Sequence, residues 1–234
     1  MQVKSVNAGQ GANWFKCGWD LFKQDYGTWF IIFLVFIALS IVLSLIPMVG
    51  SLILAVISPA LIAGYMYAAS ELEKGNDINV GYLFQGIKDT ERRNKLLMLG
   101  GLYVLAQFLM MAVMVSLVGG NAMMAEGAPG EFDPDTMMTF GMGLSMLLVF
   151  LIGAIIMMGL IYATPLIMLD NLSPVESIKA SYSAGLKNIL PLLVFGIVYI
   201  LLAIVAAIPF GLGFLVLIPV SILALYCSYK SMFH

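Results

Sequence analysis

The chain has 234 residues, of which 62% are apolar and only 10% are charged. Soluble globular domains carry about 25% charged residues, so this composition excludes a soluble globular chain and predicts an all-α integral membrane protein. The 11 basic and 13 acidic residues give a net charge of −2, but their distribution along the chain is strongly uneven.

The chain begins with a polar lead-in, followed by an amphipathic helix that we expect to start at Trp14, with Asn13 as its N-cap. Trp14 and Trp19 are of the residue type that favours the lipid headgroup zone, so both are candidates for contact with the membrane interface. Met1–Tyr26 has no apolar core or cleavage pattern, so a signal peptide is not expected.

Six apolar runs without Asp, Glu, Lys, Arg or His are long enough to cross a bilayer, which takes about 20 residues. They are Trp29–Ile46, Leu52–Ala69, Leu96–Val118, Phe140–Thr164, Ile189–Ile208 and Leu212–Tyr229. Pro- and Gly-containing turns at 47–50 and 209–213 join the first and the last pair into hairpins. Full spans and re-entrant hairpins are both compatible with such apolar turns. Ala60, Gly64 and Ala68 are four residues apart, which predicts a seam where another helix approaches closely.

Two further amphipathic helices are predicted between the hairpins. Asn79–Lys88 has apolar residues at helical spacing and leads into a charged run that contains Arg92, Arg93 and Lys95. This run is interpreted as a solvated helix start, with anionic-lipid contact as the alternative. From Ser173 a capping box with Glu176 opens the third helix, whose polar face carries the lipid candidates Lys179 and Lys187.

The pattern predicts a single membrane domain, 1–234, built from three similar units at about 13–70, 79–164 and 173–230. In each unit a Gly, an apolar residue and a Lys come shortly before a new span. The fold class is therefore six transmembrane helices arranged as three hairpins, each preceded by a cytoplasmic-side interfacial helix.

Charge predicts the orientation. Every Lys and Arg lies before span one, between spans two and three, between spans four and five, or after span six. The positive-inside rule then places both termini in the cytoplasm. Cys17 and Cys227 would share this reducing side, so we expect small buried thiols and no structural disulfide.

Catalytic machinery is sparse in this sequence. No span contains a carboxylate, and His234 is the one histidine, so neither an activated nucleophile nor a metal site is predicted within the membrane. Asp170 and Glu176 are explained as helix-end and capping residues. We therefore predict no enzyme, no cofactor and no nucleic-acid partner.

Two alternatives involve the spans themselves. Pro59, Pro165 and Pro219 each interrupt the second span of a hairpin, which indicates either packing kinks or a shared central pore lined by three kinked helices. Methionine is concentrated between Met98 and Met168. The outer-side residues Met123, Met124, Met137 and Met138 could bind Cu(I) through their thioethers, whereas filling of apolar gaps explains them without a metal.

The chain also resembles a known family. Leu169–Lys179 (LDNLSPVESIK), followed by Ser181-Tyr182 and Lys187-Asn188 before a span, is similar to the bacterial six-helix YciC-type inner-membrane proteins. The same resemblance extends to the membrane region beside some glycerophosphodiester phosphodiesterases. The turns at 46–50 and 208–213 resemble one branch of these proteins. The resemblance implies a bacterial inner-membrane protein and supplies no catalytic residue.

Two functional hypotheses follow. The first is a non-enzymatic envelope component that binds membrane lipids, a partner membrane protein or a second copy of itself. The second is a small-solute channel or passive transporter.

Overall fold

The computed structural model describes the backbone of residues 3–127 and 134–234, and the side chains of residues 3–117 and 143–234. All regular structure in these residues is helical. The elements are α1 (Gln10–Gln24), α2 (Tyr26–Ser44), α3 (Val49–Glu73), η1 (Val80–Phe84), α4 (Gln85–Lys88), α5 (Thr90–Gly127), α6 (Pro134–Leu160), α7 (Ala163–Asp170), α8 (Pro174–Lys187), α9 (Ile189–Ala207) and α10 (Phe214–Phe233).

The six predicted spans are confirmed as helices. Within the described part of the chain, six helical segments are long and apolar enough to cross a membrane: Tyr26–Ser44, Val49–Glu73, Thr90–Leu117, Gly143–Asp170, Ile189–Ala207 and Phe214–Phe233. The fourth segment is interrupted at 161–162, where α6 ends and α7 begins. The protein is thus an all-α, multi-pass integral membrane protein.

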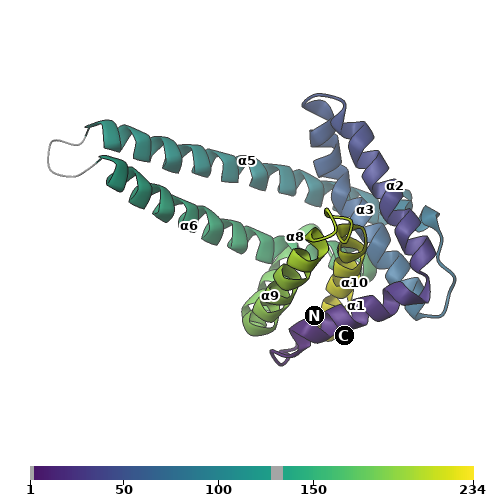
Figure 1. Cartoon of the computed structure of the whole chain (residues 1–234). Coiled ribbons are helices and arrows are strands. Elements are labelled where there is room, and N and C mark those ends of the chain that lie inside the picture. The colour runs from purple at the N-terminus through teal and green to yellow at the C-terminus, as the bar shows by residue number, and fades with distance from the viewer. Residues whose placement is uncertain (1–2, 128–133) are drawn as a thin grey trace.

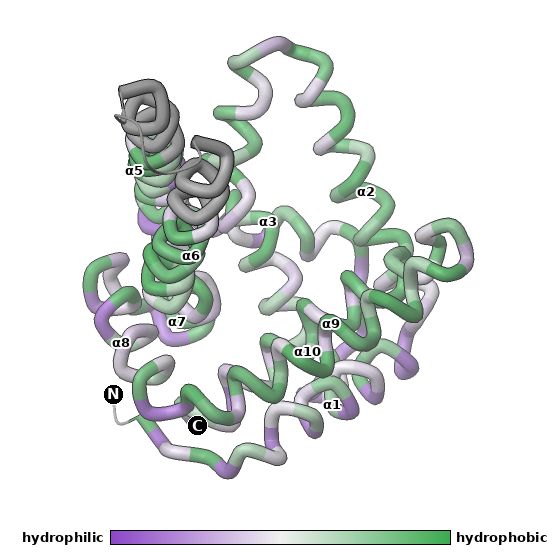
Figure 2. The backbone as a smooth tube through the Cα atoms, turned by 60° about the vertical axis from the view of Figure 1, so that its left-hand side comes forward, coloured by the Kyte–Doolittle hydropathy of each residue, from purple (hydrophilic) through white to green (hydrophobic). Residues whose placement is uncertain are grey.

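The spans form three hairpins that diverge from a common base, as Figure 1 shows for α2–α3, α5–α6 and α9–α10. In Figure 2 the hairpins are largely hydrophobic, and hydrophilic stretches gather along α1, around α7 and α8 and near the chain ends. Two hairpin turns use the left-handed backbone region, at Met48 (φ 59°) and at Phe210 and Gly211 (φ 52° and 82°). The apolar turns are therefore tight reversals.

The amphipathic helices begin at polar caps. Ser173 and Glu176 form the predicted capping box at the start of α8, and the side chain of Asn79 accepts a 2.9 Å hydrogen bond from the N–H of Gly81 before η1. The second predicted helix is thus a 3₁₀ turn continued by α4. The predicted start of the first helix at Trp14 is wrong, because α1 begins four residues earlier, at Gln10.

Each amphipathic segment packs through a glycine against the closing helix of a hairpin. Gly86 of α4 lies against the backbone of Ala60 in α3, and Gly18 of α1 lies against the backbone of Ala224 in α10. Gly185 of α8 meets the side chain of Met158 in α6. The amphipathic segments of the second and third predicted units therefore each contact the hairpin of the unit before them. The amphipathic helix of the first unit contacts the hairpin of the third. A ring of this kind holds the three hairpins at one base.

The predicted small-residue seam on α3 is confirmed. Ala60 and Ala68 are fully buried, and a Cβ added to Gly64 would collide with the backbone carbonyl of Leu83 in η1. The seam therefore receives the η1–α4 segment, because only small side chains permit such a close backbone approach.

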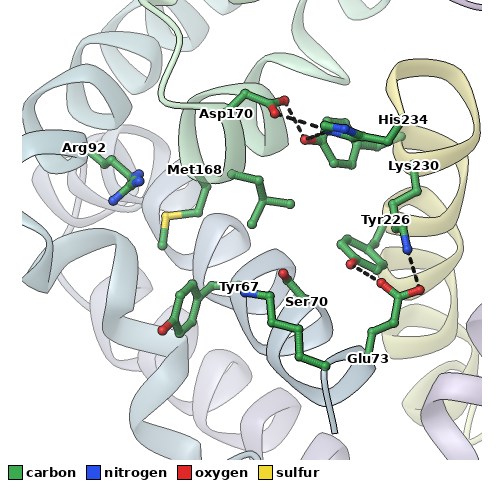
Figure 3. Close-up of a pocket in the computed structure, with 12 residues that line it drawn as sticks. Tyr67, Ser70, Glu73, Arg92, Met168, Asp170, Tyr226, Lys230 and His234 are labelled. Carbon is green, nitrogen blue, oxygen red and sulfur yellow. Dashed lines mark hydrogen bonds and ion pairs between the residues drawn. The ribbon is translucent and has the colours of Figure 1, made fainter. Parts of the chain in front are cut away.

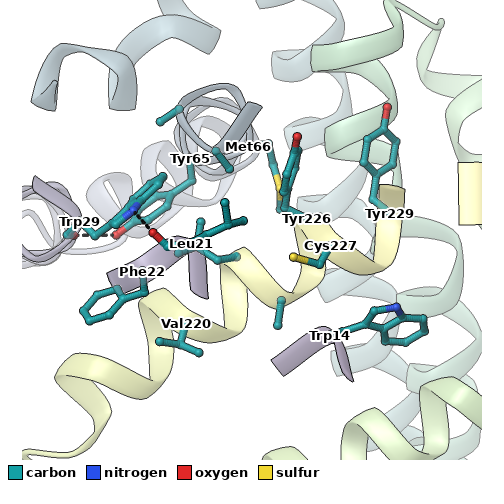
Figure 4. Close-up of a cluster of buried hydrophobic side chains, with 14 of the residues drawn as sticks. Trp14, Leu21, Phe22, Trp29, Tyr65, Met66, Val220, Tyr226, Cys227 and Tyr229 are labelled. Atoms are coloured by element: carbon teal, nitrogen blue, oxygen red, sulfur yellow. Dashed lines mark hydrogen bonds between the residues drawn. The ribbon is translucent and has the colours of Figure 1, made fainter. Parts of the chain in front are cut away.

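The main hydrophobic core lies between α1, α3 and α10 (Figure 4). Trp29 and Tyr65 stack with ring centroids 5.6 Å apart, and the Trp29 indole N–H donates to the carbonyl of Leu21 at 3.2 Å. Because a buried indole N–H needs a hydrogen-bond acceptor, this contact fixes the end of α1 against the first hairpin.

The expectation of separate thiols is wrong, since Cys17 of α1 and Cys227 of α10 form a disulfide. Their Cα atoms are 6.3 Å apart, within the range that a disulfide bridges. The physical reason is that α1 lies along α10, which brings residues 210 positions apart together. Sequence spacing carries no information about that contact.

Candidate functional site

The candidate site is a pocket of about 680 Å³ at the hydrophilic base of the molecule (Figure 3). It opens beside the start of α5, where the ends of the three closing spans meet: α3, α10, and α7, which continues the span begun by α6. Its lining contains both signs of charge together with three tyrosines: Tyr67, Ser70, Glu73, Lys74, Arg92, Met168, Leu169, Asp170, Tyr226, Tyr229, Lys230 and His234.

One wall is built around the carboxylate of Glu73 at the end of α3. Glu73 accepts hydrogen bonds from the ammonium of Lys230 at 2.6 Å and from the hydroxyl of Tyr226 at 2.7 Å. Both donors belong to α10, so this cluster joins the closing helices of the first and third hairpins. Such charge-assisted bonds are stronger than neutral ones.

A second carboxylate, Asp170 at the end of α7, has the same kind of partners. The hydroxyl of Tyr229 donates to Asp170 at 2.5 Å, and His234 Nε2 lies 3.2 Å from the other carboxylate oxygen. The hydroxyl oxygen of Tyr229 and Nε2 of His234 are also 2.9 Å apart. Asp170 therefore links the closing helix of the second hairpin to α10.

Arg92 lines the pocket from the side of α5, across from the two carboxylates (Figure 3). Its guanidinium pairs with Asp89 through one terminal nitrogen. Burial raises the pKa of Asp89, but hydrogen bonds from the backbone and the guanidinium of Arg92 outweigh this effect and hold the pKa below its ordinary value. Asp89 therefore stays ionised and fixes Arg92 at the pocket.

The guanidinium of Arg92 keeps an unused donor. Its Nε is buried and has no hydrogen-bond partner within the part of the protein that the structure describes. Buried polar groups are rarely left unpaired, because each costs about 1–3 kcal/mol.

Lys74 is the remaining cation of the pocket. It forms a 2.8 Å ion pair with Glu71, and this hydrogen bond raises the pKa of the Lys74 ammonium. Three cations and two carboxylates thus face a single cavity, and both carboxylates are already hydrogen-bonded to tyrosine.

Beneath the pocket the three closing helices are packed together. Tyr65, Leu166 and Leu223 are buried there, and the hydroxyls of Tyr162 and Ser228 are 3.0 Å apart. The described side chains therefore place a core under the pocket, so the site has the form of a binding cavity at the base of the hairpins.

Trp14 and Trp19 are placed differently from each other. Trp14 is 2% exposed and donates its indole N–H to Ser231 at 2.9 Å, which differs from the predicted headgroup contact because the ring is enclosed by protein. Trp19 is 44% exposed and stacks on Phe22, a position compatible with an interfacial ring.

The basic lipid candidates are dispersed. The ammonium of Lys95 donates to the carbonyl and side-chain oxygens of Asn171 at 2.9 and 2.7 Å, and Lys187 donates to the carbonyl of Val3 at 3.3 Å. Lys179 is exposed on α8, and Arg93 is half-buried on α5. Among these candidates only Arg92 lines the pocket. The copper candidates Met123, Met124, Met137 and Met138 lie outside the described side chains.

The sequence did not point to most of the pocket. Glu73, Tyr226 and Tyr229 sit at the ends of apolar runs, and helix packing alone brings them beside Asp170. The one available signal was the presence of acids and tyrosines at the basic end of successive closing spans.

The fold and site define a class, that of six-span α-helical membrane proteins with a polar pocket at the base. The chain is similar over its full length to a protein of Burkholderia thailandensis named "Probable inner membrane protein", at 26% identity across 93% of that protein. No protein-family profile matches the chain, and no solved structure matches it.

Proposed function

We propose that the protein is a non-enzymatic component of a bacterial inner membrane that binds the headgroup of a membrane lipid in the base pocket. The observation that carries the proposal is the pocket itself, which collects charged and aromatic side chains from the ends of three membrane helices and from the start of a fourth. Headgroups lie at the depth of helix ends, where Tyr and Arg side chains meet them.

Several features support binding in preference to chemistry. The Tyr226 and Tyr229 hydroxyls donate to carboxylates, an arrangement that fixes the acids and leaves their remaining lone pairs to accept from a ligand. The pattern of basic residues supports a cytoplasmic orientation of this base and of both chain ends, whereas the Cys17–Cys227 disulfide is a bond typical of oxidising compartments and stands against it. In that orientation the pocket takes lipid from the inner leaflet.

Lipid retention tests the proposal. The protein is purified in mild detergent, and its bound lipids are extracted and identified by mass spectrometry. The expected result is a lipid retained in stoichiometric amount, with reduced retention in Arg92→Gln and unchanged retention in Arg93→Gln, whose side chain does not line the pocket. Protein that retains no lipid, or equal retention in both variants, would contradict it.

A partner membrane protein or a second copy of the chain remains the alternative ligand in the same function. Co-purification of a stable partner whose binding is lost in Arg92→Gln would favour it over a lipid.

Passage of a small solute is the second candidate function. It is favoured by Pro59 and Pro219, which lie inside closing helices α3 and α10, and by Pro165 of α7. Against it stands the packed core under the pocket. Flux through liposomes that contain the protein is the test, and a bilayer sealed to ions and small metabolites would exclude it.

Copper handling by Met123, Met124, Met137 and Met138 stays a separate, minor proposal. Metal analysis after copper loading, with all four changed to Leu as the control, decides it.

A further inference from the structure

Charge is divided across the base pocket. The two carboxylates belong to α3 and α7 and share a wall with α10, whereas Arg92 comes from α5 and faces them across the cavity (Figure 3). A ligand that spans this cavity therefore meets Arg92 at one end and, at the other, two carboxylates together with Lys74, Lys230 and His234.

The acidic end suits a primary ammonium group. Glu73 accepts from Tyr226 and Lys230, and Asp170 accepts from Tyr229 and lies 3.2 Å from Nε2 of His234. Carboxylate oxygens have lone pairs for further N–H donors. An ammonium with N–H bonds satisfies these acceptors better than a quaternary ammonium, which has no hydrogen to donate.

The basic end suits a phosphate. The Arg92 side chain lines the cavity, and a guanidinium matches the oxygens of a phosphate in geometry as well as in charge. Asp89 pairs with one terminal nitrogen only, so Arg92 is held in place without all of its donors being used.

We propose that the base pocket recognises a phosphoethanolamine group, with the phosphate at Arg92 and the ammonium at Glu73 and Asp170. This inference rests on the proposed function and names the headgroup that the pocket selects. The group can come from the lipid phosphatidylethanolamine or from a free phosphoethanolamine metabolite, because both carry a primary ammonium joined to a phosphate through the same two-carbon link.

The test is a set of binding measurements by calorimetry on the purified full-length protein in detergent. The probes are short-chain phosphatidylethanolamine, phosphatidylglycerol and phosphatidylcholine, together with free phosphoethanolamine and inorganic phosphate. Short-chain phosphatidylethanolamine is expected to bind about tenfold or more tightly than phosphatidylglycerol, since one charge-assisted hydrogen bond is lost in the latter. If free phosphoethanolamine binds as tightly, the source is the soluble metabolite.

Matched variants locate the two ends. Arg92→Gln and Asp170→Asn are each expected to weaken phosphatidylethanolamine binding about tenfold or more, while Arg93→Gln and Asp77→Asn leave it unchanged because neither residue lines the pocket. Asp170→Asn should also reduce the preference over phosphatidylglycerol. If this variant fails to fold, Glu73→Gln provides the same comparison.

The failures are distinguishable. Equal or tighter binding of phosphatidylglycerol or of inorganic phosphate would overturn the ammonium subsite while leaving lipid binding intact. Equal binding of phosphatidylcholine would overturn recognition of N–H donors. Binding of free phosphoethanolamine but of no lipid probe would overturn the proposed function and leave this inference intact, whereas absence of binding by every lipid probe and by free phosphoethanolamine would overturn both.

Discussion

The opening and closing helices of the hairpins differ in what surrounds them. In α3 and α10, 44% and 50% of the residues in the membrane window are buried, whereas the values for α2 and α9 are 17% and 11%. In these two hairpins the opening helices are also the more apolar ones, whereas in the second hairpin both windows are 17% buried and the closing segment is the more apolar. Apolar content therefore marks helices that face lipid, while small residues and tyrosines mark the helices that pack against protein.

This contrast predicts a large difference between two leucines. Leu61 of α3 is fully buried and Leu201 of α9 is 59% exposed. Leu61→Ala should lower the free energy of unfolding by about 2–5 kcal/mol, because it leaves a cavity in a packed site. Leu201→Ala should have almost no effect, since lipid fills the space. Thermal unfolding in mild detergent measures both, and equal shifts would remove the contrast.

The disulfide is the second way to sharpen the comparison, because it ties α1 to a closing helix. Cys17→Ser with Cys227→Ser should lower stability by about 2–4 kcal/mol. Reductant should lower the unfolding temperature of the native protein to that of the double variant, and it should leave the unfolding temperature of the double variant unchanged. Thiol labelling of unreduced, purified protein checks the bond, and full labelling of both cysteines would contradict the structure.

A matched glycine pair tests close packing. A Cβ on Gly64 of α3 meets the backbone of Leu83, which cannot move aside, whereas a Cβ on Gly196 of α9 meets nothing within 4 Å. Gly64→Ala is expected to cost about 1–3 kcal/mol. Gly196→Ala should be neutral or stabilising by up to about 1 kcal/mol, since Ala is the better helix former. Reversal of this order in unfolding measurements would refute the docking of η1 on α3.

The smallest effect is expected at Asp89, which caps the base of opening helix α5. Its carboxylate accepts from the backbone N–H groups of Glu91 and Arg92, both at 3.1 Å, so Asp89→Ala should cost about 1 kcal/mol. The pKa of Asp89 is lowered in the folded protein. Its contribution is therefore present above the ordinary Asp pKa and is lost as the pH falls through the lower folded value. The variant and native unfolding temperatures should converge in strong acid, and a constant gap would contradict this.

Most of the fold was predictable because hydropathy and helix length report directly on membrane spans. The seam at Ala60, Gly64 and Ala68 was predictable for a similar reason, since a four-residue spacing of small side chains has one structural meaning. The capping box at Ser173 and Glu176 is a local pattern. Each of these signals depends on neighbouring residues alone.

The pocket and the disulfide were not predictable, because they depend on how distant helices pack. Nothing in the local sequence of Cys17 indicates that it lies beside Cys227. Likewise, an aromatic residue before a span predicts a headgroup contact, yet Trp14 is buried against α10 because the ring formed by the amphipathic helices encloses it. Arg92 was a lipid-binding candidate because of its charge alone. Its position across the pocket from Glu73 and Asp170 exists only in the folded chain.

Cross-linking tests the convergence of the closing helices most directly. Cysteines placed at Glu73 and Lys230, whose side chains are 2.6 Å apart, are treated with a short bifunctional maleimide, with cysteines at Glu73 and Lys187 as the control. The structure predicts that mass spectrometry recovers the cross-linked α3–α10 peptide from the first pair in high yield and little from the control. Equal yields, or none from the first pair, would show that the closing helices do not meet at a common pocket.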